Sequence, residues 1–182
     1  LRSLDGVYVN RSDIVGRFRS QLATRLIEPV DPLYPNGKSF YETLSRGQLY
    51  ELSKSWEDYS LENMRDLLRS NHGVGNQFNE FISNQLNKDI YILNAQTKDV
   101  QLMEDDPDLF YKNRESIILL YHPPLSKNGI DIGTGHYELV GLLDTGKRVH
   151  TLFNSDHPLI HFIQTRMNRV RRIGQGSVGS VH

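Results

Sequence analysis

The fold of this chain is decided by residues 135–140, Gly135-His136-Tyr137-Glu138-Leu139-Val140. We expect them to begin a strand that extends from His136 to Leu143. Because side chains alternate along a strand, His136 and Glu138 point to one face and Tyr137 points to the other. The stretch therefore predicts an imidazole and a carboxylate side by side on the same face of a sheet.

Further strands are predicted around this stretch, because short runs there are rich in β-branched and aromatic residues. The runs are Ile90–Leu93, Val100–Leu102, Ser116–Tyr121 and Lys147–Phe153. The turn Asp144-Thr145-Gly146 would join the last of them to the strand His136–Leu143 as a hairpin. The sequence thus predicts a sheet of about five strands in its second half.

Apolar residues at helical spacing predict helices through the first half and one helix after the sheet. The expected helices are Asp13–Leu26, Ser39 to about Lys54, one opened by Ser60, one carrying Phe78–Leu86 and one capped by Asp156. Their expected buried sides include Ile14, Val15, Phe18, Leu22 and Leu26 in the first helix, Phe40, Leu44 and Leu52 in the second, and Leu159, Ile163 and Met167 in the last. Helices followed by strands predict an α+β fold, with the helices packing on the sheet, rather than a doubly wound parallel sheet.

Composition limits the classes of function. The chain has 182 residues, 37% of them hydrophobic and 24% charged, which predicts one compact domain with one core. A net charge of −1 supplies no field for holding a nucleic acid, so we expect no nucleic-acid partner. No apolar run is long enough for a membrane span, and residues 1–5 have no signal-peptide hydrophobic region, although a signal further upstream stays open. We expect a soluble, cytoplasmic protein, in the host cytoplasm if it is viral. The chain contains no cysteine, which excludes disulfides and thiolate zinc sites within it.

His136 and Glu138 have the chemistry of a general base and the group that orients it. A carboxylate that holds one ring nitrogen fixes the tautomer and stabilises the imidazolium, and it leaves the other nitrogen to accept a proton. The alternative is a strand-end histidine beside a solvated glutamate. On the local pattern alone this alternative is favoured, because His-x-Glu in a strand is common by chance.

A glycine-containing loop with Gly129, Gly133 and Gly135 precedes His136. Glycine lets the backbone approach a ligand closely, so an extended ligand could lie across Gly133-Thr134-Gly135. His122 precedes two prolines and is expected to end a strand. No pair of histidines has a convincing metal-ligand spacing with a carboxylate, so we expect neither a metal nor another cofactor.

The order of elements resembles that of the ovarian-tumour (OTU) family of deubiquitinating cysteine proteases, of the type encoded by large DNA viruses. In that family an Asp-Gly-x-Cys-Leu-Phe-Arg-type motif opens a helix, further helices and strands follow, and a His-aromatic-polar motif lies on a late strand. The segments that resemble it are Leu1-Arg2-Ser3-Leu4, Asp13–Leu26, Tyr59–Asn94 ending in DIYIL, ESIILLYHPP at 115–124 and GTGHYELVGL at 133–142.

The resemblance implies a papain-type cysteine protease fold over residues 1–169 and cleavage after the Gly-Gly end of ubiquitin or polyubiquitin, by a monomer. It implies His136 as base and Glu138 as orienter, with Thr134, Gly135 and Tyr137 flanking the ubiquitin tail and backbone amides near the cysteine forming an oxyanion hole. The nucleophilic cysteine is the departure, because it would fall two residues before Leu1. A cysteine upstream, a modified or replaced cysteine, and an inactive relative all remain open, and we favour the first two. The rival function is a non-catalytic ubiquitin-binding or regulatory domain attached to a kinase.

The last residues contain a second motif. Residues 173–181 read Ile-Gly-Gln-Gly-Ser-Val-Gly-Ser-Val, which fits the G-x-G-x-x-G-x-V loop that covers ATP phosphates in protein kinases. The alternative is a flexible glycine-serine tail. We expect residues 170–182 to be the start of a following kinase domain, with a strand before the glycines.

Overall fold

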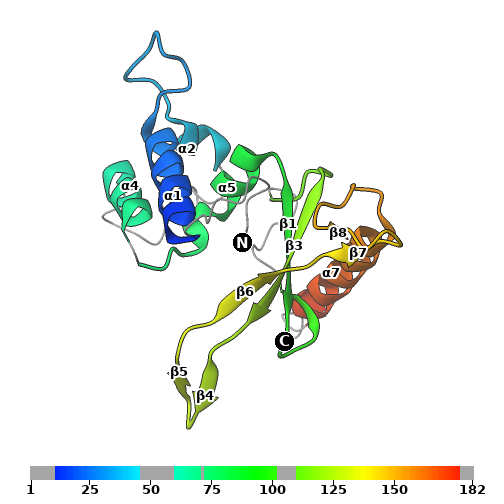
Figure 1. The fold of residues 1–182 in the computed structure, drawn as a ribbon. Helices are drawn as coiled ribbons and strands as arrows, with labels where there is room; N and C mark the ends of the chain where they lie inside the picture. The colour runs from blue at the N-terminus through cyan, green and yellow to red at the C-terminus, as the bar shows by residue number, and fades with distance from the viewer. Residues whose placement is uncertain (1–10, 46–59, 71, 102–109, 177–182) are drawn as a thin grey trace, which may run out of the picture. The chain divides into compact units, whose positions relative to one another are not determined.

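The computed structural model describes residues 11–45, 60–70, 72–101 and 110–176. Contacts divide the chain into two compact units, Leu1–Gln85 and Leu86–His182. In the described parts, the first unit is helical, and the second holds a mixed sheet and a long helix (Figure 1). The predicted α+β class is confirmed. The described residues form two clusters of buried side chains, one in each unit, and the single domain with one core expected from the sequence stays a prediction.

The helices of the first unit begin close to their predicted positions. They are α1 (Arg11–Ile27), α2 (Phe40–Leu44), α4 (Leu61–Arg69), the 3-10 turn η1 (Asn76–Phe78) and α5 (Asn79–Leu86). Ser39 starts α2 with a capping box, in which the Ser39 hydroxyl accepts from the Glu42 amide and the Glu42 carboxylate accepts from the Ser39 amide. The helix expected from Ser39 to Lys54 is wrong in length, because α2 ends at Leu44. The rest of that stretch, with Leu52, lies outside the described residues.

The core of the first unit forms around the C-terminal half of α1. Its members are Leu22, Ala23, Leu26, Tyr41, Met64, Leu68, Phe78 and Phe81. Ile14, Val15 and Phe18 were expected in this core, but they are 46%, 55% and 40% exposed. Helix α4 reaches α1 only as far as Arg19. The Arg19 guanidinium donates to the carbonyls of Leu67 and Leu68, in the last turn of α4, at 3.0 and 2.8 Å. The turns of α1 before Arg19 therefore extend past the end of α4.

The sheet of the second unit has four strands, in the order β2-β1-β3-β6. They are β1 (Asp89–Asn94), β2 (Asp99–Gln101), β3 (Ser116–His122) and β6 (His136–Leu139). β1 and β3 are parallel, and the other neighbours are antiparallel. Among the described residues no fifth strand joins this sheet, and the strand expected over His136–Leu143 breaks after Leu139.

The break separates β6 from a small hairpin of β7 (Leu142–Leu143) and β8 (Val149–His150). A Cβ at Gly141 would lie 2.5 Å from the Val149 side chain and 3.3 Å from the His150 carbonyl. Only glycine lets the chain pass β8 this closely, so Gly141 marks where β6 leaves the sheet.

A second hairpin lies within the segment expected to be a loop. β4 (Leu125–Lys127) pairs with β5 (Ile130–Ile132), and Asn128 and Gly129 connect them with φ of 55° and 76°. Two positive φ values in a two-residue Asn-Gly connection are typical of a type I′ turn. The expectation of an irregular loop is therefore wrong, and the Asn-Gly pair was the signal for the hairpin.

Helix α7 (Pro158–Gly176) covers one face of the sheet. Ile160, Ile163 and Met167 are buried against Tyr91 and Ile118 of the strands. Leu159 was expected on this buried side and is only partly buried there. The strand expected before the kinase-like glycines is wrong, because α7 continues without a break to Gly176. Residues 177–182 lie outside the described residues, so the following kinase domain stays a prediction.

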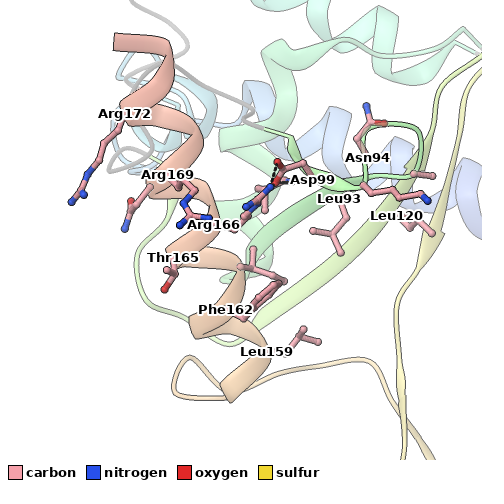
Figure 2. A pocket seen from close by; sticks show the side chains of 15 residues that line it. Leu93, Asn94, Asp99, Leu120, Leu159, Phe162, Thr165, Arg166, Arg169 and Arg172 are labelled. Carbon is pink, nitrogen blue, oxygen red and sulfur yellow. Dashed lines mark hydrogen bonds and ion pairs between the residues drawn. The ribbon is translucent and has the colours of Figure 1, made fainter. Parts of the chain in front are cut away.

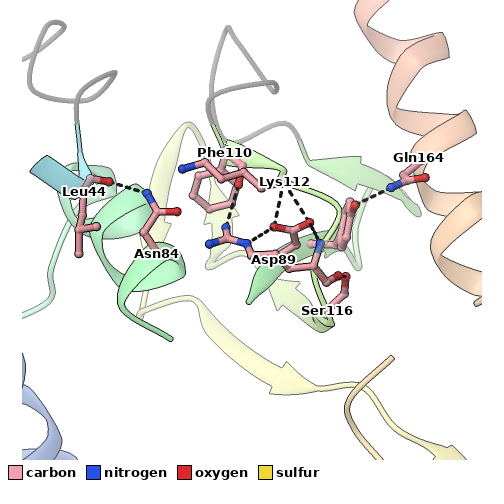
Figure 3. A network of polar contacts seen from close by, with 9 residues as sticks. Leu44, Asn84, Asp89, Phe110, Lys112, Ser116 and Gln164 are labelled. Carbon is pink, nitrogen blue, oxygen red and sulfur yellow. Dashed lines mark hydrogen bonds and ion pairs between the residues drawn. The ribbon is translucent and has the colours of Figure 1, made fainter. Parts of the chain in front are cut away.

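A buried carboxylate anchors the start of the sheet. Asp89 has a side chain that is 1% exposed, and it accepts from Arg114 Nε at 2.8 Å. It also accepts from the backbone amides of Lys112 at 3.1 Å and Arg114 at 3.0 Å (Figure 3). The segment before β3 is thereby tied to the first residue of β1. A buried charge held by these three donors is stable only while its partners remain.

Asp89→Ala should therefore destabilise the second unit strongly. Removing one partner of a buried ion pair costs about 3–5 kcal/mol, because the other charge stays buried. The free energy of unfolding, measured by urea denaturation followed by circular dichroism, should fall by that amount. The matched control is Lys88→Ala, which removes the neighbouring and more exposed contact with Glu115 and should cost at most about 1 kcal/mol. Equal losses would show that the Asp89 contacts are not an anchor.

Candidate functional site

The site is created by the register between β3 and β6. β3 ends in Tyr121-His122 and β6 begins with His136-Tyr137, so antiparallel pairing sets Tyr opposite Tyr and His opposite His. The two imidazoles are stacked, with centroids 4.4 Å apart and ring planes 4° from parallel. The two tyrosine rings lie 4.8 Å apart on the other face.

Glu138 joins the two histidines. Its Oε2 lies 3.1 Å from His122 Nε2, and its Oε1 lies 3.5 Å from His136 Nε2. The side chains are 34% (His122), 62% (His136) and 58% (Glu138) exposed, so solvent and ligands reach all three. We refer to these three residues as the His–Glu cluster.

The two histidines hold the Glu138 carboxylate in its charged form. The hydrogen bond from His122 is the main reason that the pKa of Glu138 lies below its usual value, and the contact with His136 adds to the effect. Glu138 is therefore an anion at neutral pH. A group in this state is able to accept hydrogen bonds, stabilise an imidazolium or ligate a cation.

The predicted pair of His136 and Glu138 is brought together on one face, as strand alternation required. His122 is the member that the sequence analysis missed as a site residue. It lies 16 residues before Glu138, and only the pairing of β3 with β6 brings it near. The mirrored order Tyr-His and His-Tyr at the two ends of residues 121–137 was the available signal. The same pairing places three groups that could hold a metal ion within reach of one another, where no metal was expected.

The three residues predicted to contact substrate lie at the start of β6 or just before it. Thr134 is exposed, whereas Tyr137 lies on the face of β6 opposite to His136. Gly135 has a structural reason to be glycine, since a Cβ there would lie 2.7 Å from the Tyr121 ring and 3.0 Å from the His122 carbonyl. We therefore expect a larger side chain at Gly135 to disturb the β3–β6 pairing as well as any ligand.

A groove of about 940 Å³ lies between α7 and the sheet, on the same face of β3 as His122. Leu93 and Leu120 of the strands line it, as do Leu159 and Phe162 of α7 (Figure 2). Phe162 is 68% exposed, which is unusual for so large an apolar side chain. Leu120 lines the groove and is also the cross-strand partner of Glu138.

Basic side chains form one side of this groove. Arg166, Arg169 and Arg172 project from successive turns of α7 (Figure 2). Asp99 holds Arg166 through two contacts of 2.9 Å, which place the pKa of the Asp99 carboxyl below its usual value. Arg169 and Arg172 are exposed. An apolar floor beside exposed arginines suits a ligand with an apolar part and a negative charge.

A second exposed histidine–carboxylate pair lies in the β7–β8 hairpin. His150 Nε2 is 2.8 Å from Asp144 Oδ2, and this contact is the main reason that the pKa of Asp144 is lowered. The pair has one histidine in place of two, so it is a natural control for the cluster.

Comparisons with known proteins identify no relative. No protein-family description matches the chain, and no curated protein or solved structure matches it. Within the described residues, no helix is both long and apolar enough to cross a membrane. Function therefore has to be argued from the residues of the site.

The pKa of Glu138 should depend more on His122 than on His136. Carbon-detected NMR titration of the Glu138 carboxyl should show a midpoint below the usual glutamate value, and His122→Ala should raise it more than His136→Ala does. Because the folded-state pKa is lowered, any stability gained from this contact is present above the ordinary glutamate pKa. It is lost as the pH falls through the lowered value.

The His150→Ala variant supplies the control for this titration. It should raise the pKa of Asp144 and leave that of Glu138 unchanged. If His122→Ala leaves the titration midpoint of the Glu138 carboxyl unchanged, the geometry of the cluster is contradicted.

Proposed function

We propose that the chain is an OTU-like, papain-type deubiquitinase domain that hydrolyses the isopeptide or peptide bond after the Gly-Gly end of ubiquitin. One observation supports this most directly, the contact between Glu138 Oε1 and His136 Nε2. A carboxylate on Nε2 leaves Nδ1 as the nitrogen that exchanges a proton with the reacting groups.

In the proposed mechanism His136 acts as the general base. Nδ1 accepts the proton of a cysteine thiol as the sulfur attacks the carbonyl carbon, and the imidazolium later gives this proton to the leaving amine. The thioester that remains is hydrolysed by water, which His136 deprotonates in turn. Glu138, an anion because its pKa is lowered, stabilises the imidazolium in both steps.

His122 is a positioning residue in this proposal. It holds Oε2 of Glu138 at 3.1 Å, so the other oxygen is directed towards His136. Without His122 the Glu138 side chain would be free to adopt other rotamers, because it is 58% exposed. We therefore expect His122 to affect the rate less than His136 does.

The position of β6 supports an extended substrate. Among the described strands, β6 is at the edge of the four-stranded sheet, so the Gly-Gly tail could pair with it through backbone hydrogen bonds. A tail in that position would pass Thr134 and Gly135 and would then run alongside β6, flanked by the side chains on both faces of that strand. Tyr137 would then contact the tail from the face opposite to His136.

The nucleophile is outside the 182 residues in this proposal, since they contain no cysteine. The lack of cysteine is also the observation that favours the second candidate function, a non-catalytic ubiquitin-binding or regulatory domain of a kinase-containing protein. The two differ in one simple respect, which is whether a cysteine precedes Leu1 in the parent chain at the position that the OTU motif requires.

A chain that includes the residues before Leu1 should cleave a fluorogenic ubiquitin substrate. His136→Ala should lower kcat/KM by roughly a thousandfold or more, because the base is lost, and Glu138→Gln should lower it less. His150→Ala is the control, since its histidine–carboxylate pair lies in another hairpin, and it should keep full activity.

Full activity in His136→Ala would exclude the mechanism. An inactive extended chain that still binds ubiquitin, with binding unaffected by His136→Ala, would favour the regulatory domain instead.

A further inference from the structure

We propose that His122, His136 and Glu138 bind one divalent transition-metal ion of the Zn²⁺ class. This inference depends only on the geometry and chemistry of the His–Glu cluster, and it stands whether or not the chain is part of a protease. Among the described residues, this is the one group of three or more histidine or acidic side chains whose ligand atoms lie close enough to share an ion.

The distances within the cluster suit a shared ion. One ligand atom from each residue lies within 4.8 Å of the others. Zinc lies about 2.0–2.1 Å from a histidine nitrogen and at a similar distance from a carboxylate oxygen, so two of its ligands are roughly 3.3 Å apart in a tetrahedral site. Each Glu138 oxygen lies near that separation from one imidazole nitrogen: Oε2 is 3.1 Å from His122 Nε2, and Oε1 is 3.5 Å from His136 Nε2.

The imidazoles need a small change to meet one ion. Because the two rings are stacked and nearly parallel, any in-plane lone pairs on their Nε2 atoms lie in separate parallel planes and do not meet at one point. A rotation about χ2 makes the lone pairs converge, and this torsion is soft in histidine. The side chains are exposed enough to make that rotation, while the β3–β6 register keeps their backbones in place.

The set of ligands selects the class of ion. Two neutral imidazoles and one carboxylate suit zinc and its neighbours cobalt, nickel and copper, whereas Mg²⁺ and Ca²⁺ prefer oxygen ligands alone. Three protein ligands leave one position of a tetrahedral ion for water. No thiolate competes for the ion within the 182 residues, because they contain no cysteine.

The metal would also act on the proposed protease, and this consequence rests on the proposed function. An ion on His136 Nε2 takes the place of the Glu138 contact that stabilises the imidazolium. A neutral imidazole that binds the ion through Nε2 carries its hydrogen on Nδ1, so His136 would have no ring nitrogen left to accept the thiol proton. Zinc should therefore inhibit the cysteine-containing chain.

Isothermal titration of the 182-residue chain with Zn²⁺ near neutral pH tests the site itself. We expect one strong site per chain. In NMR spectra the imidazole signals of His122 and His136 should shift together and saturate at one equivalent, while those of His150 and His161 stay in place. Mg²⁺ at the same concentrations should shift none of them.

Single substitutions identify the ligands. His122→Ala, His136→Ala and Glu138→Gln should each weaken Zn²⁺ binding at least about tenfold. All three side chains are exposed, so circular dichroism should confirm that the variants remain folded. The matched control is His150→Ala, which removes the two-residue site with Asp144 and should leave the affinity unchanged.

The proposal is overturned if Zn²⁺ does not bind, if binding spreads over several histidines, or if His150→Ala weakens it as much as His122→Ala does. Inhibition is measured separately in the cysteine-containing chain. If zinc binds at the His–Glu cluster without slowing cleavage, the metal site is supported. The role of His136 as base is then contradicted.

Discussion

The antiparallel register of β3 against β6 is the constraint on which the site depends. It sets His122 opposite His136 and Leu120 opposite Glu138, so all four side chains share the face that α7 covers elsewhere. A shift of one residue would move His136 and Glu138 to the other face. The tyrosine pair and the closely fitting Gly135 favour the same register from the second face.

The elements that could be predicted are those whose signal is local. The apolar spacing of α1, α4 and α7 and the β-branched runs of β1 and β3 depend on residues within one element, and each was found close to its observed position. The predictions that were wrong concern residues whose burial or strand pairing depends on a segment distant in the sequence. Ile14 is exposed because α4 ends beside Arg19, and β6 stops early because β8 passes close to Gly141. Neither contact leaves a pattern in the local sequence.

The candidate site divides in the same way. His136 and Glu138 could be placed together from the alternation of a single strand, whereas His122 required knowledge of which strand is the neighbour of β6. The Asn128-Gly129 turn and the mirrored Tyr-His and His-Tyr ends gave that information, but only when considered together. The groove beside α7 could not be predicted, because it depends on how a helix and a sheet pack.

The parallel pairing of β1 with β3 has a consequence for the order in which the second unit folds. The hairpins β4–β5 and β7–β8 join residues close in sequence and can form early, within microseconds for a typical hairpin. β1 and β3 must first close a longer loop, which costs more chain entropy before any contact compensates for it. We therefore expect this closure, secured by Asp89 and Arg114, to limit the folding rate. The β4–β5 hairpin already brings the ends of β3 and β6 together, so the two histidines should meet before the sheet beneath them is complete.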